Sequence, residues 1–74
     1  MAPAPAHSTE VKVNGEHVML ATGTTVEAVV LMFSPSTKGV AVALNGEIVP
    51  RSAWPETGLA AGDAVEVLAA AQGG

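Results

Sequence analysis

The sequence predicts one small α+β domain, because strand-like segments come first, one helical segment follows, and further strand-like segments complete the chain. Its 74 residues leave room for a single domain, since domains cluster at roughly 100–150 residues with a lower tail at about 50. Apolar residues make up 49% of the chain, but aromatic residues only 3%. The core is therefore expected to be thin, aliphatic and rich in β-strands.

The first predicted element is a β-hairpin. Residues 10–14 alternate polar and apolar side chains, which places two valines on one face of a strand. Asn14-Gly15 is a dipeptide that tolerates the positive φ angles of a tight turn. Residues 17–21 then return as the second strand.

The second predicted element is a helix that begins at a capping box. Thr24 and Glu27 have the spacing at which the threonine hydroxyl accepts from the Glu27 amide while the carboxylate reaches back. Apolar side chains recur at helical spacing, which predicts an inward face formed by Val26, Val29, Val30 and Phe33. Pro35 ends the helix, because a proline biases the preceding residue away from helical angles.

The remaining elements are strands and turns. Three strands are predicted, at residues 40–45, 47–49 and 64–70. Asn45-Gly46 makes a second tight turn, and residues 51–63 contain the prolines and glycines of further turns. Within this segment Trp54 is expected to cap one end of the core, with its indole N–H donating to a carbonyl.

The element order β-β-α-β-β-β limits the topology. A right-handed connection after the first hairpin places the helix across one face of the sheet. The last strand then fits beside the first, where it is central and faces the helix. The arrangement that satisfies both conditions is a β-grasp, a mixed sheet of about five strands packed on one helix.

The ends of the chain differ from its middle. Residues 1–9 alternate proline and alanine without hydrophobic periodicity, so we expect a flexible extension before a domain at 10–70 and a flexible tail at 71–74. The extension lacks the basic start and apolar stretch of a signal peptide. No apolar run is long enough for a membrane helix, and a cytoplasmic protein is expected.

Charge and cysteine content exclude several classes of function. Three basic residues against seven acidic ones give a net charge of −4, which argues against a nucleic-acid partner. The chain has no cysteine, and hence no disulfide, no thiol nucleophile and no Cys-ligated metal. His7 and His17 are far apart and make a poor metal site. We therefore expect no catalytic residue and no bound metal.

Three segments resemble a known family. They are GVAVALNGEIVPRSAW at residues 39–54, AAGDAVEVL at 60–68, and the end AAAQGG. Together they resemble the ThiS sulfur carriers of thiamine biosynthesis, which belong to the ubiquitin-like ThiS/MoaD family of β-grasp proteins. The NGEIVPR run and Trp54 match the thiamine carriers, whereas molybdopterin carriers tend to have a proline before Gly-Gly. Ala71 stands where the family usually has a larger aliphatic residue.

The resemblance implies a carrier and not an enzyme. The Gly74 carboxylate would be adenylated with ATP by an E1-like enzyme of the ThiF type. Persulfide sulfur from a donor such as a cysteine desulfurase would convert it to a thiocarboxylate, and thiazole synthase of the ThiG type would receive that sulfur. Gln72, Gly73 and Gly74 would enter the partners' active sites, and glycine suits a narrow channel because it has no Cβ. The carrier itself would bind no cofactor.

An apolar patch is expected to dock on the activating enzyme. If the valines of the last strand face inward, at least one of Leu68 and Ala70 faces outward, and Ala41 and Ala43 lie opposite the valine face of their own strand. By resemblance to ubiquitin-like proteins, Ala41, Ala43 and Leu68 would form the patch. The alternative is that they are ordinary exposed apolar residues.

Three other functions were weighed against the sulfur carrier of thiazole formation. A β-grasp carrier of another pathway, such as molybdopterin or cysteine synthesis, would have the same fold. An acyl carrier would be largely helical, with a serine that opens a helix, and the strand-rich pattern contradicts both features. A β-grasp interaction module would carry the terminal Gly-Gly without using it.

Overall fold

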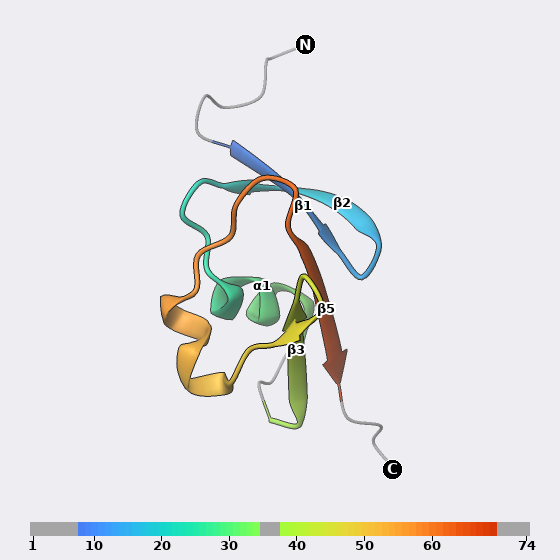
Figure 1. The fold of residues 1–74 in the computed structure, drawn as a ribbon, viewed down its shortest axis with the longest axis vertical. Coiled ribbons are helices and arrows are strands. Elements are labelled where there is room, and N and C mark those ends of the chain that lie inside the picture. The colour runs from blue at the N-terminus through green and yellow to red at the C-terminus, as the bar shows by residue number, and fades with distance from the viewer. Residues whose placement is uncertain (1–7, 35–37, 70–74) are drawn as a thin grey trace.

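The computed structural model describes residues 8–34 and 38–69 as one sheet packed against one helix (Figure 1). Its elements are, in chain order, β1 (Ser8–Val13), β2 (Glu16–Ala21), α1 (Val26–Phe33), β3 (Val40–Leu44), β4 (Glu47–Ile48), the 3-10 helix η1 (Arg51–Glu56) and β5 (Ala64–Ala69). β1 begins two residues before the predicted strand, because Thr9 pairs with Leu20 and is itself buried. Neither helix is long and apolar enough, in this described part of the chain, to cross a membrane.

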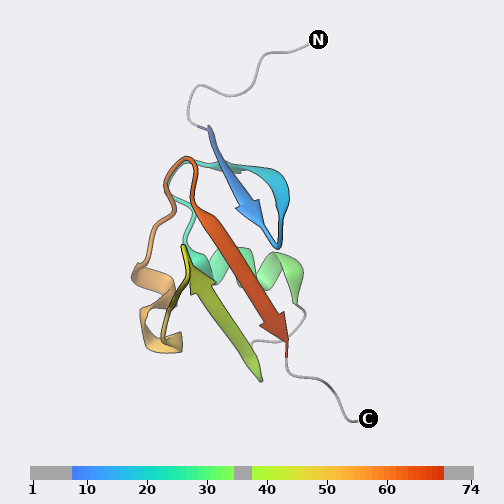
Figure 2. The ribbon, with the colours of Figure 1, turned by 45° about the vertical axis from the view of Figure 1, so that its right-hand side comes forward.

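The sheet has the predicted mixed topology. Its five strands lie in the order β2-β1-β5-β3-β4. The central pair β1 and β5 is parallel, and the other neighbours are antiparallel. The helix α1 lies across one face, and β5 runs between β1 and β3 (Figure 2). The predicted β-grasp is therefore confirmed.

Both Asn-Gly turns have the predicted geometry. Asn14 and Asn45 each have a φ of 52°, and the glycines that follow them have φ of 86° and 87°. Two successive residues in the left-handed region form the turn that matches the twist of an antiparallel hairpin. These turns set the registers of the β1–β2 and β3–β4 hairpins.

The N-terminus of α1 differs from the prediction. Thr25 is the N-cap, and its hydroxyl accepts from the Ala28 N–H at 3.2 Å. The Thr24 hydroxyl instead donates to the Ala21 carbonyl at 2.6 Å, so the capping box predicted on Thr24 is wrong. The physical reason is that backbone groups of residues 57–59 hydrogen-bond on either side of Thr25, which keeps the chain extended until the helix begins.

The core lies between α1 and the inner face of the sheet. Its apolar side chains come from both helices, from the loop after η1 and from every strand except the short β4. They are Val11, Val13, Leu20, Val26, Val29, Val30, Val42, Trp54, Leu59, Val65 and Val67. The predicted inward position of Phe33 is wrong, because this side chain is 44% exposed. Phe33 is the last residue of α1, almost one turn beyond Val30, which is fully buried.

The segment predicted as turns contains η1, which brings Trp54 into the core. Trp54 is 2% exposed, and its indole N–H donates to the Val49 carbonyl at 2.9 Å. The predicted capping role is therefore confirmed. The buried Leu59 was not predicted, because a single apolar residue among turn residues has no periodicity.

We expect Trp54→Phe to lower the free energy of unfolding by about 1–3 kcal/mol, because it removes buried ring volume and leaves the Val49 carbonyl without its donor. Urea denaturation followed by circular dichroism measures the change. Phe33→Leu is the control, with an expected change within about 0.5 kcal/mol. A larger loss for Phe33→Leu than for Trp54→Phe would contradict this description of the core.

Candidate functional site

The outer face of the sheet, opposite α1, carries an apolar patch at one end. Ala41 of β3 pairs directly with Leu68 of β5, and Ala43 pairs with Ile48 of β4. Paired residues project to the same face, so these four side chains are neighbours on the outer face. Leu68 is 59% exposed and Ile48 is 70% exposed. We call Ala41, Ile48 and Leu68, with Ala43 between them, the outer patch.

Ala43 is less exposed than Ala41 and Leu68, the other two residues of the predicted patch. Ala41 and Leu68 are exposed, whereas Ala43 is only 8% exposed. Ala43 has a paired residue on both sides, Ile48 on β4 and Glu66 on β5, and their longer side chains cover its methyl group. Ala43 therefore forms the floor of the patch, and a partner would meet its neighbours.

Ile48 belongs to the outer patch but was absent from the predicted one. The signal was present in the sequence, because strand alternation with Val49 inward places Ile48 outward. In the structure Val49 packs against the core, and Ile48 is the most exposed large apolar residue described. A short strand of two residues gave too little pattern to identify it.

Acidic side chains border the outer patch. Glu66 lies opposite Ala43 on β5, and Glu47 precedes Ile48 on β4; both are exposed. The patch is therefore an apolar surface with a negative border, which suits a partner with an apolar centre and basic residues around it.

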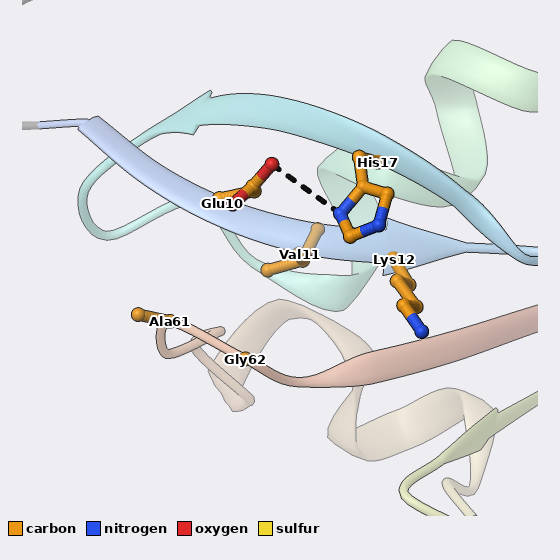
Figure 3. Close-up of a pocket in the computed structure, with 6 residues that line it drawn as sticks. All are labelled: Glu10, Val11, Lys12, His17, Ala61 and Gly62. Atoms are coloured by element: carbon orange, nitrogen blue, oxygen red, sulfur yellow. Dashed lines mark ion pairs between the residues drawn. The ribbon is translucent and has the colours of Figure 1, made fainter.

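The other half of the outer face, formed by β1 and β2, combines charged and polar side chains with the exposed Met19. A small pocket of about 160 Å³ lies between β1, β2 and the turn before β5, and it is lined by Glu10, Val11, Lys12, His17, Ala61 and Gly62 (Figure 3). His17 Nδ1 lies 3.3 Å from Glu10 Oε2, with both side chains more than half exposed. An exposed pair of this kind contributes little energy. The pocket is too small to enclose a substrate.

The described residues contain no group of three or more His, Cys, Asp or Glu side chains that could hold a metal ion. His17 faces Glu10, and His7 lies outside the described residues. The described geometry thus offers a surface for docking at the outer patch.

The predicted tail residues Gln72, Gly73 and Gly74 lie outside the described residues, as do the predicted extension before Ser8 and the segment 35–37. The strand that leads to the tail is described. β5 ends at Ala69, which pairs with Val40, and Leu68 of the outer patch is the residue before it. The patch and the chain terminus therefore belong to one segment, separated by six positions from Leu68 to Gly74.

Comparison with known proteins agrees with this architecture. The sequence model of the ThiS family matches residues 5–74. The crystal structure of the thiamine biosynthesis protein ThiS from Geobacter metallireducens is similar, with 32% sequence identity and a TM-score of 0.74. The similarity covers 89% of this chain and 100% of that one. None of the curated proteins matches the sequence.

We expect Ala43→Glu to destabilise the fold by about 2 kcal/mol or more, because it places a carboxylate at a buried position directly opposite Glu66. Ala41→Glu is the matched control: it lies on the same strand and face, but it is exposed and pairs with Leu68. Its expected cost is below about 1 kcal/mol. Urea denaturation of both variants measures the difference, and equal costs would show that Ala43 is not the floor of the patch.

Proposed function

The chain belongs to the ThiS family, and on that basis we propose that it carries sulfur for thiamine biosynthesis on its C-terminal residue, Gly74. The observation that carries the proposal is the family match, which extends over residues 5–74 and so includes the Gly-Gly end. The outer patch supports it independently, since it offers a partner an exposed apolar docking surface.

The chemistry begins at the Gly74 carboxylate. An α-carboxyl group has a pKa of about 3.5, so it is ionised at neutral pH and is a poor electrophile. In the proposed first step a carboxylate oxygen attacks the α-phosphorus of ATP, pyrophosphate leaves, and an acyl-adenylate forms. The partner that catalyses this step is an E1-like enzyme of the ThiF type.

The second step exchanges AMP for sulfur. The terminal sulfur of a persulfide, supplied through a donor such as a cysteine desulfurase, attacks the acyl carbon and displaces AMP, which gives an acyl disulfide. A thiol of the partner then attacks the S–S bond. The thiocarboxylate leaves on Gly74, and the donor cysteine and the attacking thiol are oxidised to a disulfide. The carrier needs no cysteine of its own, and it has none.

The tail must reach a partner's active site. Five residues, 70–74, follow the last residue of β5, and five residues of extended chain span roughly 17 Å. Gly73 and Gly74 lack a Cβ, so a channel that admits them needs to be only as wide as the backbone. Gln72 precedes them and would lie at the channel's entrance. The thiocarboxylate is then delivered to thiazole synthase of the ThiG type.

The outer patch is the proposed docking surface for the activating enzyme. Leu68 and Ile48 supply the exposed apolar area, Ala41 lies between β4 and β5 on the same face, and Glu66 and Glu47 border it. Burial of a few large apolar side chains commonly supplies most of the affinity of an interface. ATP-dependent activation takes place in the cytoplasm, and the proposal assigns the carrier to that compartment with no cofactor of its own.

Removal of Gly74 is expected to abolish sulfur transfer and leave the fold unchanged. The chain would be incubated with ATP, a sulfur donor and the activating enzyme of its own cell, and its intact mass recorded. The full chain should gain the mass difference between sulfur and oxygen, and the truncated chain should gain nothing. An unmodified full chain in the presence of active partners would refute the proposal. Thermal unfolding of the truncated chain that differs clearly from the full chain would assign the tail a structural role instead.

Leu68→Asp is expected to lower kcat/KM for adenylation by about tenfold or more, because it places a charge at the centre of the docking surface. Met32→Asp is the matched control: Met32 is 59% exposed, as Leu68 is, but it lies on α1, on the opposite side of the sheet. Pyrophosphate release measures the rate for both variants. Equal losses would show that docking does not use the outer patch.

A further inference from the structure

The parallel pairing of β1 with β5 continues past the end of β1. Where the two strands meet, the Lys12 N–H donates to the Asp63 carbonyl and the Asn14 N–H to the Val65 carbonyl, each at 2.9 Å. These carbonyls are two residues apart, as a strand edge requires. The next carbonyl on that edge of β5 belongs to Val67, and β1 has already turned away at Asn14.

The Asn14 side chain takes the place of the missing strand. Its Nδ2 donates to the Val67 carbonyl at 3.3 Å, and its Oδ1 accepts from the Val67 N–H at 2.8 Å. A primary amide has one carbonyl and an N–H donor, the same pair of groups as a peptide unit. The side chain therefore binds both backbone groups of Val67, which a longer parallel β1 would bind through two different residues.

The turn alone does not require this amide. Asn14 has a φ of 52°, which aspartate and glycine also tolerate in such turns. Asn45 has the same φ in the other turn, but its side chain binds the opposite end of β5. There Oδ1 accepts from the Ala64 N–H at 2.9 Å, and Nδ2 donates to Asp63 Oδ1 at 3.0 Å. The two turns thus have the same φ at their asparagine, but the two asparagine side chains bind different residues of the chain.

We propose that Asn14 is a positioning residue for the carrier reaction, which holds the final residues of β5, and with them Leu68 of the outer patch, in the position that the activating enzyme binds. This inference rests on the proposed function. β3 pairs with β5 along its other edge as far as Ala69, so with Asn14 in place the end of β5 has a partner on each side. A strand end that is already ordered loses less entropy when it docks, which favours binding.

The test compares Asn14→Gly with Asn45→Gly. Both keep a residue that tolerates positive φ and both delete one amide, so their effects on the turn and on the unfolded chain are matched. Asn14→Gly should raise the hydrogen-exchange rate of the Val67 amide by about two- to tenfold, the range that corresponds to one hydrogen bond. Asn45→Gly should raise exchange at Ala64 and leave Val67 unchanged.

The kinetic constants of adenylation distinguish a positioning role from a purely structural one, because a purely structural role would leave them unchanged. For adenylation by the activating enzyme, Asn14→Gly should raise KM for the carrier by about two- to tenfold with kcat unchanged. Asn45→Gly should leave both constants at the wild-type values. Equal KM values for the two variants, or unchanged exchange at Val67 in Asn14→Gly, would overturn the proposal.

Asn14→Asp is the second variant, in case the glycine variant does not fold. It keeps the acceptor for the Val67 N–H and replaces the donor with an oxygen that faces the Val67 carbonyl. Its KM should also rise, and a wild-type KM would count against the proposal. Failure of the wild-type chain to be adenylated would refute the proposed function alone, because exchange at Val67 measures the Asn14 contact without any partner.

Discussion

The structure depends on the placement of β5, the last strand of the chain, at the centre of the sheet. β5 pairs in parallel with β1 on one edge and antiparallel with β3 on the other. Within the described chain, the two hairpins β1–β2 and β3–β4 join in the sheet through β5. Its inward valines, Val65 and Val67, pack in the core against α1. The sheet is therefore complete only when the final strand has been added, and contacts far apart in sequence hold the domain together.

Strand alternation gives β5 one face in the core and one exposed face. Val65 and Val67 face the core, whereas Glu66 and Leu68 face outward, next to Ala43 and Ala41 of β3. A change on the outer face can alter docking without opening a cavity in the core. A small domain with little interior can in this way present a partner surface without loss of stability. The same alternation explains why a floor residue such as Ala43 is needed, since a larger side chain there would separate the neighbouring side chains of the patch.

The sequence predicts well what depends on neighbouring residues. The two Asn-Gly turns, the strand alternation and the helical spacing of Val26, Val29 and Val30 are local signals, and each predicted its element. The errors arise where distant segments meet. The helix cap is Thr25 and not the predicted Thr24, because residues 57–59 form backbone hydrogen bonds on either side of Thr25. Ala43 is buried by side chains from two other strands, and the contact between Asn14 and Val67 joins positions 53 residues apart. No local pattern contains that information.

Asn14 also shows how a short chain reconciles two conflicting demands on its strands. β1 must turn after Val13 so that β2 can return beside it, while β5 must continue to Ala69 to pair along the whole of β3. β5 therefore extends beyond its parallel neighbour, and the backbone groups of Val67 would lack partners on that edge. An asparagine at the first turn position satisfies the positive φ and supplies the missing amide at the same time. The backbone groups of Val67 are thus satisfied on the β1 edge, although β1 itself ends at Val13.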